Sequence, residues 1–269
     1  GPMSALEIDG CRIHLVVEGP PEAPAVLFTH GAMLDHTSWA PQAEALAHRY
    51  RVVRWDLPGH GQSQPLGRFE RDSGGRALLA IMDHLELERA ALVGLSVGGW
   101  IAQWVAQQAP ERVRALACFG TTSISEPTFP GVALRGLRAS AGLTAALPFG
   151  LLRRALPRVL ARTAGARAHA LAKAEATRRE DFLRFWRGAS HLIEPDPDAG
   201  CRPPLLIAHG EHDLVARIPK YARRWSERCP EAQLAVIPGA GHLANLDAPD
   251  ATTAVLERFL RAHAPAGGE

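Results

Sequence analysis

The sequence predicts a three-layer α/β fold built on a mostly parallel, eight-stranded sheet with helices on both faces. Three observations predict it: apolar runs of the length of buried strands, helical patterns between most of these runs, and a hairpin pattern near the start of the chain. Strands that alternate with helices form parallel sheets whose faces are covered. A chain of 269 residues is long enough for one such core with an insertion.

The elements of this fold can be assigned in chain order. A hairpin is predicted between residues 6 and 18, where two strand-like segments meet at Asp9-Gly10, a pair typical of tight turns. Buried strands are predicted at Ala25–Thr29, Arg51–Trp55, Ala90–Leu95, Val113–Phe119, Pro204–His209 and Gln233–Ile237. Helices of the same domain are predicted at Ser38–His48, Ser73–Leu85, Val97–Gln108, Pro219–Arg228 and Pro249–His263.

Residues 122–200 break this rhythm, because they are rich in arginine, alanine and leucine and contain no convincing strand pattern. We therefore predict a core formed by residues 1–121 and 201–269 and a helical cap insertion formed by residues 122–200. Helices are expected in the cap at Phe149–Leu160 and Arg167–Trp186. Both resemble basic membrane-surface helices, but acidic residues interrupt the second, which favours solvated cap helices.

Composition and charge narrow the class of protein. A net charge of +2 provides no basic face for nucleic acid, so no such partner is expected. No stretch approaches the roughly 18 to 20 apolar residues of a membrane span, which predicts a soluble, cytoplasmic protein with no membrane partner. Four scattered cysteines predict reduced, mostly structural thiols, with a disulfide-bonded periplasmic chain as the alternative. Without a metal-ligand cluster or a phosphate-binding glycine loop, neither a metal nor a cofactor is predicted.

The strongest local signal is Gly94-Leu95-Ser96-Val97-Gly98, which lies between a predicted strand and a predicted helix. A G-x-S-x-G pattern in this context predicts a nucleophile elbow, in which a sharp turn lifts the serine toward substrate. The two glycines would let neighbouring segments pass close to the turn. Taken alone, the pattern also fits a plain turn serine.

A serine hydroxyl needs a base to become nucleophilic, and the base needs a carboxylate that fixes its tautomer. His242 and Asp213 follow Ser96 in the chain order serine, acid, histidine, and each comes directly after a predicted strand. Their turns should open at the same sheet edge as Ser96. We therefore predict Ser96 as nucleophile, His242 as general base and Asp213 as the orienting acid, with Glu211 as the alternative acid.

The negative oxygen that forms during attack needs hydrogen-bond donors. We predict the backbone N–H groups of Val97 and Ala32, with that of Met33 as the alternative to Ala32. Substrate contacts are expected from His30, Gly31, Met33, Trp100, Phe129 and Trp186. His30, His36 and His60 lie in early loops that could also approach the site, but a supporting or structural role is expected for them.

Together these residues resemble the α/β-hydrolase superfamily. His30-Gly31 looks like its oxyanion-loop signature, residues 56–63 look like its D-x-x-G-x-G-x-S turn, and residues 94–99 match its elbow. The resemblance implies an α/β-hydrolase fold in which residues 122–200 take the place of the variable cap. It also implies a mainly structural role for the Asp56 segment.

Two further segments, residues 51–63 and 242–249, look like the branch that holds enol-lactonases, small-ester hydrolases and cofactor-free haloperoxidases or perhydrolases. The loop at residues 30–33 departs from the usual oxyanion loop of the enol-lactonases. Haloalkane dehalogenases and epoxide hydrolases of this fold carry an aspartate where Ser96 stands, so their chemistry is not expected.

We therefore expect a serine hydrolase that cleaves a small, largely apolar carboxylic ester or lactone through an acyl-enzyme intermediate. A monomer or a homodimer is expected. The alternatives are a carbon–carbon bond hydrolase, an acyltransferase or perhydrolase of the same fold, cofactor-free oxygen chemistry with a histidine base, and a slow-turnover receptor-type binding protein. The same three side chains serve several of these reactions, so the sequence alone does not separate them.

Overall fold

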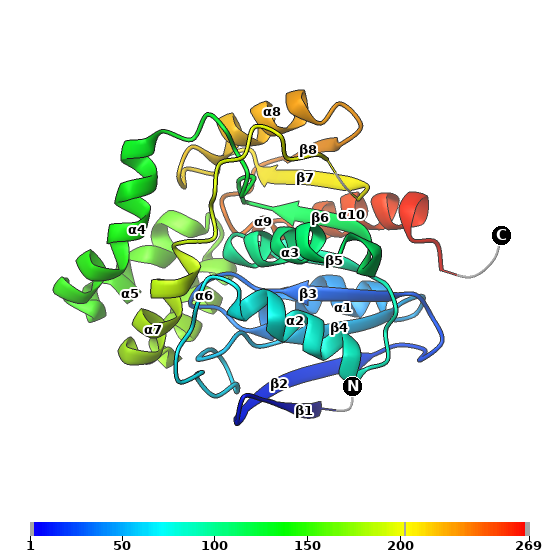
Figure 1. Cartoon of the computed structure of the whole chain (residues 1–269), viewed down its shortest axis with the longest axis horizontal. Helices are drawn as coiled ribbons and strands as arrows, with labels where there is room; N and C mark the ends of the chain where they lie inside the picture. Colours follow the sequence, from blue (N-terminus) through cyan, green and yellow to red (C-terminus); the bar gives the residue numbers. More distant parts are fainter. Residues whose placement is uncertain (1–2, 202, 267–269) are drawn as a thin grey trace.

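The computed structural model describes residues 3–201 and 203–266 and contains one eight-stranded sheet with the strand order β1-β2-β4-β3-β5-β6-β7-β8. The pairs β1–β2 and β2–β4 are antiparallel, and all other neighbouring pairs are parallel. Figure 1 shows the sheet running through the middle of the molecule with helices packed around it. The predicted fold class is confirmed.

The strands are β1 (Met3–Ile8), β2 (Cys11–Glu18), β3 (Ala25–Thr29), β4 (Arg51–Trp55), β5 (Ala90–Leu95), β6 (Val113–Phe119), β7 (Leu205–Gly210) and β8 (Gln233–Ile237). Five of the six predicted buried strands have the predicted bounds, and β7 lies one residue further along the chain. The hairpin turn between β1 and β2 is also as predicted, with φ of 49° at Asp9 and 75° at Gly10.

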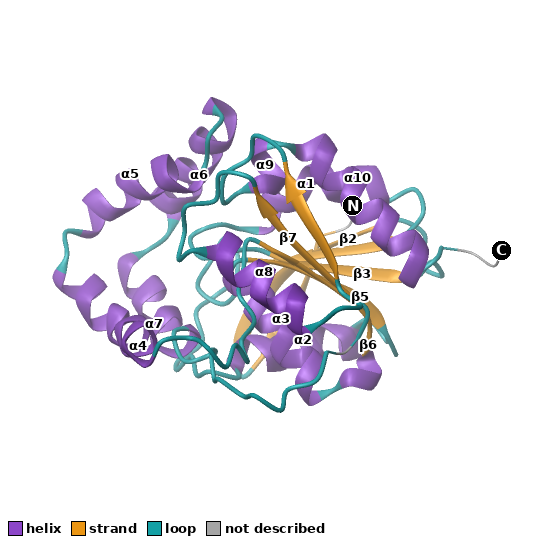
Figure 2. Ribbon diagram, turned by 90° about the horizontal axis from the view of Figure 1, so that it is seen from above, coloured by secondary structure: helices purple, strands orange, loops and turns teal. Residues whose placement is uncertain are grey.

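Helices cover both faces of the sheet because successive strand residues point to opposite faces. Leu27 and Leu92 pack in a core with α2 (Ser73–His84), α3 (Val97–Gln108) and α8 (Ile218–Arg228). Phe28 and Val93 pack in a second core with α1 (Ala40–Leu46) and α10 (Pro249–His263). Figure 2 shows α1 and α10 on one side of the strands and α2 and α3 on the other.

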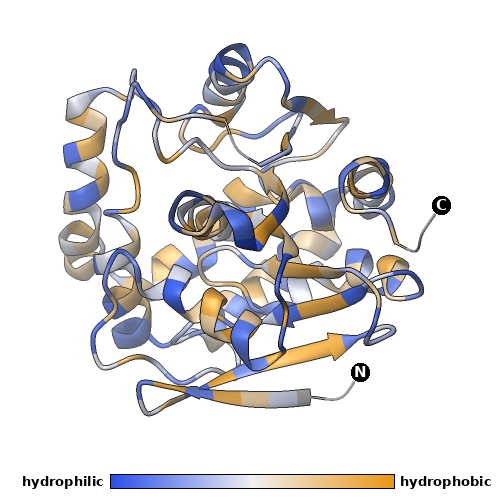
Figure 3. Cartoon of the chain, turned by 45° about the vertical axis from the view of Figure 1, so that its right-hand side comes forward, coloured by the Kyte–Doolittle hydropathy of each residue, from blue (hydrophilic) through white to orange (hydrophobic). Residues whose placement is uncertain are grey.

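The hydropathy of the elements follows this arrangement. The central strands are largely hydrophobic, whereas the outer helices alternate between hydrophobic and hydrophilic residues (Figure 3). An amphipathic helix buries one stripe against a sheet and leaves the other in water. Within the described ranges, no helix is both long and apolar enough to cross a lipid bilayer.

Between β6 and β7 the described residues form four helices: α4 (Gly131–Ala146), α5 (Phe149–Leu160), α6 (Ala164–Ala176) and α7 (Arg179–Ala189). They lie together at one end of the sheet (Figure 1). The prediction of a single helix over 167–186 was wrong, because Thr177 and Arg178 are extended and separate α6 from α7. Helix α4 was not predicted, since it buries only Ala141 and so lacks an apolar stripe. The division into core and cap stays a prediction.

A disulfide joins Cys201 to Cys229, so the prediction of reduced thiols was wrong for this pair. The chain runs out along β7 and returns along α8, which brings two Cα atoms 28 residues apart to within 5.7 Å. The two cysteines meet because of the path of the chain through the fold, so their spacing in the sequence does not predict the disulfide. Cys11 and Cys118 are free thiols.

Candidate active site

Ser96 occupies a strained turn between β5 and α3. Its φ of 54° and ψ of −121° lie in a region that residues other than glycine rarely adopt. The N–H of Ser96 donates to the carbonyl of Phe119 at 2.9 Å, which ties the turn to the end of β6. The side chain is partly exposed. This is the geometry that the sequence pattern predicts for a nucleophile elbow.

Close backbone contacts explain the two glycines of this turn. A Cβ at Gly94 would lie 2.4 Å from the backbone of Gly98. A Cβ at Gly98 would lie 2.4 Å from the carbonyl oxygen of Thr29. Since real Cβ atoms do not approach backbone atoms this closely, only glycine lets β3, β5 and α3 meet around Ser96.

His242 and Asp213 form a buried pair. Asp213 follows β7 and His242 follows β8, and the Nδ1 atom of His242 donates to Oδ2 of Asp213 at 2.9 Å. The other carboxylate oxygen accepts the N–H of Val215 at 2.9 Å. The two side chains are 3% and 0% exposed. Because Nδ1 donates to the carboxylate, Nε2 of the neutral ring carries the lone pair that a general base needs.

The end of β6 connects this pair to the elbow. Phe119 accepts the N–H of Ser96, and a Cβ on the next residue, Gly120, would lie 3.3 Å from Nδ1 of His242. On the other side, a Cβ on Gly31 would lie 3.5 Å from the Cβ of Ser96. The three segments therefore converge at the carboxyl ends of the parallel strands, where open α/β sheets bind their ligands. The catalytic roles of these residues stay predictions.

Glu211, the alternative acid, has other partners. Its carboxylate accepts the N–H of Gly239 at 2.8 Å and lies 3.5 Å from His212. Its side chain is 51% exposed, whereas that of Asp213 is fully buried. The geometry therefore favours Asp213 as the partner of His242.

A buried histidine, His30, forms hydrogen bonds that fix the loop after β3. Nε2 of His30 accepts the N–H of Leu57 at 3.0 Å, so Nδ1 is the protonated atom and donates to the carbonyl of Gly31 at 2.7 Å. Burial lowers the pKa of His30, and it lowers the pKa of the neighbouring His60 to about 3. His30 was among the expected substrate contacts; it is fully buried, which favours the structural role that was also expected for it.

The predicted oxyanion donors have free N–H groups. In the part of the chain that the structure describes, the N–H groups of Ala32 and Val97 have no acceptor, and neither has that of Met33. The loop turns at Met33, where φ is 58°, and the N–H of Leu34 closes the turn on Gly31 at 3.2 Å. Since polar groups inside proteins are nearly always paired, unpaired N–H groups next to Ser96 fit a site that receives an anionic oxygen.

Two of the predicted aromatic contacts, Trp100 and Phe129, line an apolar cavity of about 330 Å³. Leu137 and Ile193 form part of its other walls, and the start of α8 contributes residues that the sequence analysis missed, Arg217 and Tyr221. Trp186 stacks on Trp100 with ring centroids 6.3 Å apart. The sequence offered one indication of Arg217 as a site residue, which is its position four residues after Asp213.

A larger cavity of about 890 Å³ lies between residues 67–71 and α7. It is lined by several arginines and by none of the predicted site residues. The smaller cavity is the better candidate for binding substrate, because Trp100, which lines it, lies one helical turn after Ser96. The N–H of Trp100 donates to the Ser96 carbonyl at 3.3 Å.

Asp56 organises the loops beside the site. Its buried carboxylate accepts the N–H and Nδ1 of His36 at 2.7 and 2.8 Å and the N–H of Gln62 at 2.9 Å. Burial would raise the pKa of Asp56, but the hydrogen bond from His36 and nearby histidines lower it. His14, His36 and Asp56 lie close enough to share a metal ion, yet the Asp56 oxygens already accept three hydrogen bonds, which favours the structural role.

Comparison with known proteins agrees with this geometry. A family model described as alpha/beta hydrolase fold matches residues 24–249. The dihydrolipoyllysine-residue acetyltransferase component of the acetoin cleaving system of Pseudomonas putida is 31% identical over 96% of this chain and 69% of its own length. The pimeloyl-(acyl-carrier protein) methyl ester esterase of Chromobacterium violaceum is 33% identical over 86% of this chain and 91% of its own length.

Among solved structures, the enol-lactonase from Burkholderia xenovorans LB400 superposes with a TM-score of 0.79 and 26% identity, covering 96% of this chain and 99% of that protein. The resemblance to the branch with esterases and enol-lactonases is thereby confirmed. The chain belongs to the alpha/beta hydrolase fold family, and it is a hydrolase.

Proposed function

We propose that this hydrolase cleaves small, largely apolar carboxylic esters or lactones through an acyl-enzyme intermediate on Ser96. Two observations support the proposal: Ser96 lies in a strained, partly exposed turn tied to Phe119, and the next residue, Gly120, lies against the ring of His242, which is joined to Asp213 at 2.9 Å. The relatives named as an esterase and an enol-lactonase support ester and lactone bonds as the substrate class.

In the first step, Nε2 of His242 takes the proton of the Ser96 hydroxyl while the hydroxyl oxygen attacks the ester carbonyl carbon. Asp213 accepts the Nδ1 hydrogen bond and stabilises the imidazolium that forms. The N–H groups of Val97 and Ala32 donate to the carbonyl oxygen as it becomes negative. His242 then protonates the leaving alkoxide, and the acyl group stays on Ser96.

In the second step, His242 removes a proton from water, and the resulting hydroxide attacks the acyl-enzyme. The acid leaves, and the proton returns to the Ser96 oxygen. In a lactone the alcohol and the acid belong to one molecule, so the ring opens to a single hydroxy acid. The cavity beside Trp100 offers its apolar walls to the hydrocarbon part of either substrate.

The test compares wild type with Ser96→Ala on p-nitrophenyl acetate and butyrate. Wild type should hydrolyse both esters, and Ser96→Ala should lose about a thousandfold or more in kcat, because the attacking oxygen is gone. A fluorophosphonate probe should add its mass to the Ser96 peptide of wild type. Ser226→Ala is the matched control, since Ser226 lies on α8 and donates to the carbonyl of Arg223 at 2.7 Å.

Three outcomes contradict the proposal. Hydrolysis by neither protein favours the receptor-type alternative. Undiminished hydrolysis by Ser96→Ala excludes Ser96 as nucleophile. Probe labelling that persists in Ser96→Ala but disappears in another serine variant moves the nucleophile elsewhere.

A further inference from the structure

The apolar cavity beside Trp100 contains one charged group. Of the ten residues in the described part of the chain that line it, Arg217 alone carries a formal charge. We infer that Arg217 binds a carboxylate on the substrate, so that the preferred substrates are esters or lactones whose apolar part ends in an anionic group. The inference deepens the proposed function and rests on it.

Arg217 and the residue before it have an unfavourable backbone conformation. Ala216 and Arg217 are consecutive residues with φ of 46° and 58°, a left-handed conformation that is unfavourable for residues other than glycine. The turn is fixed on both sides, since Val215 donates to Asp213 at 2.9 Å and Ile218 donates to the carbonyl of Val215 at 2.9 Å. Such strain persists where the surrounding structure holds it, and it clusters at ligand sites.

The guanidinium of Arg217 has no partner of its own among the described residues. Two arginines on α8 that follow it are bonded: Arg224 donates to the hydroxyl of Thr128 at 3.0 Å, and Arg228 donates to that of Ser123 at 3.3 Å. All five N–H donors of Arg217 therefore remain for a ligand. A guanidinium binds a carboxylate through two parallel hydrogen bonds, and Arg217, which is exposed, can offer them to a ligand that enters from solvent.

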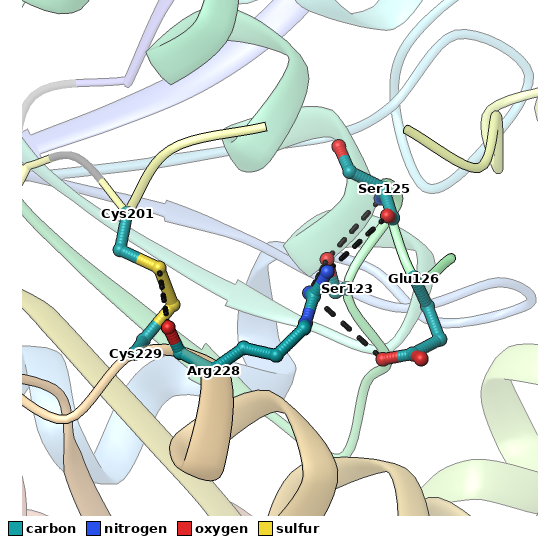
Figure 4. Close-up of a disulfide and its surroundings, with 6 residues drawn as sticks. All are labelled: Ser123, Ser125, Glu126, Cys201, Arg228 and Cys229. Atoms are coloured by element: carbon teal, nitrogen blue, oxygen red, sulfur yellow. Dashed lines mark hydrogen bonds and ion pairs between the residues drawn. A yellow bond between two sulfur atoms is a disulfide. The ribbon is translucent and has the colours of Figure 1, made fainter. Parts of the chain in front are cut away.

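Helix α8, which begins directly after Arg217, is held to neighbouring segments at both of its ends. Tyr221 stacks on Phe129 with centroids 5.2 Å apart, and Arg224 lies over the Tyr221 ring at 5.9 Å. At the far end of α8, the Cys201–Cys229 disulfide holds the helix, and beside it Arg228 reaches the segment of Ser123, Ser125 and Glu126 (Figure 4). Helix α8 is thus fixed to the segment that enters α4. A rigid wall lets a cation select a substrate with little loss of entropy on binding.

The position of Arg217 also sets which end of a substrate it meets. Asp213 contacts the catalytic base, and four residues of extended chain span about 14 Å at most. Arg217 therefore lies within one short loop of the site of bond cleavage, beside the cavity that Trp100 also lines. An ester bond near Ser96 and a carboxylate near Arg217 would be separated by the apolar part of one molecule.

The test uses pairs of ethyl esters that differ only in the far end of the acyl chain. Monoethyl adipate ends in a carboxylate, and ethyl hexanoate ends in a methyl group at the same position. Shorter and longer pairs, from succinate to suberate, vary the span. Hydrolysis is followed at constant pH by titration of the released acid, and the quantity compared is the kcat/KM of the anionic ester divided by that of the neutral one.

Wild type should prefer the anionic ester at one chain length. In Arg217→Met the ratio should fall about tenfold or more, through KM rather than kcat, because a charge-assisted bond to a bound carboxylate is lost. Arg217→Lys should recover part of the ratio by keeping the charge. Arg223→Met is the matched control, because it removes the same charge. Arg223 is exposed on α8 and does not line the cavity.

Each contrary outcome is distinct. If wild type cleaves ethyl hexanoate but prefers no anionic ester, or if Arg217→Met leaves the ratio unchanged, the inference fails and the proposed function stands. An equal fall in Arg223→Met would assign the effect to the general field of the protein and would also overturn the inference. If wild type cleaves neither class of ester, the proposed function fails and the inference fails with it.

Discussion

Replacing Asp213 by asparagine changes one atom of the group that orients His242 and leaves its shape almost unchanged. The amide oxygen can still accept the N–H of Val215, but an NH2 group then faces Nδ1 of His242 at the 2.9 Å now spanned by a hydrogen bond. Nδ1 must accept that bond, so the ring proton moves to Nε2, the atom that has to take the proton of Ser96. Turning the amide over offers no escape, because its NH2 would then meet the N–H of Val215.

We therefore expect kcat of Asp213→Asn on p-nitrophenyl butyrate to fall about a thousandfold, which corresponds to about 4 kcal/mol in the activation barrier. The melting temperature, followed by circular dichroism, should change little, because volume and burial are retained. Glu211→Gln serves as control and should keep activity near that of wild type, since Glu211 bonds to Gly239. Activity of folded Asp213→Asn within tenfold of wild type would refute the reasoning, and a loss confined to Glu211→Gln would move the acid role there.

Two further predictions concern stability. Replacing both Cys201 and Cys229 by serine opens a link between residues 28 apart and should lower the free energy of unfolding by about 3 kcal/mol, seen as a lower urea midpoint; an unchanged midpoint contradicts this. Burial would raise the pKa of Asp35, but hydrogen bonds from Lys173 and Thr37 lower it from 3.8 to about 2. That shift stabilises the fold by about 2 kcal/mol above pH 4 and is lost as the pH falls through 2, so urea unfolding of Lys173→Met should differ from wild type most at pH 6 and least at pH 2.

The central strands, β3 to β7, could be predicted closely from the sequence because they are buried on both sides and bounded by turns. A run such as Ala90–Leu95 contains no polar side chain, and its length of six residues fits a buried strand. The helices between β6 and β7 could not be predicted as well, because they lie at one end of the sheet and bury fewer residues. Helix α4 buries one residue of sixteen, so its apolar pattern carried little signal.

The same contrast holds at the site. The placement of Ser96, Asp213 and His242 at one sheet edge could be predicted because each follows a strand, and parallel strands bring their carboxyl ends to one edge; their catalytic roles stay predictions. The sequence left two roles open for His30, substrate contact or structural support, since a residue one place beyond a strand can point either into a cavity or beneath the loop. Its position depends on the N–H of Leu57, which comes from a segment 27 residues away.

One loop joins the two parts of the site. The turn that begins at Asp213 ends at Arg217, so the group that orients the base and the cation of the cavity share five residues of backbone. The hydrogen bond from Val215 to Asp213 fixes the carboxylate and also fixes the strained residues that follow it. With the roles proposed above for Asp213 and Arg217, this turn would couple catalysis to the selection of substrate. A sequence change that relaxes the strain at Ala216 would alter the direction of Arg217 and, through the same hydrogen bond, the alignment of His242.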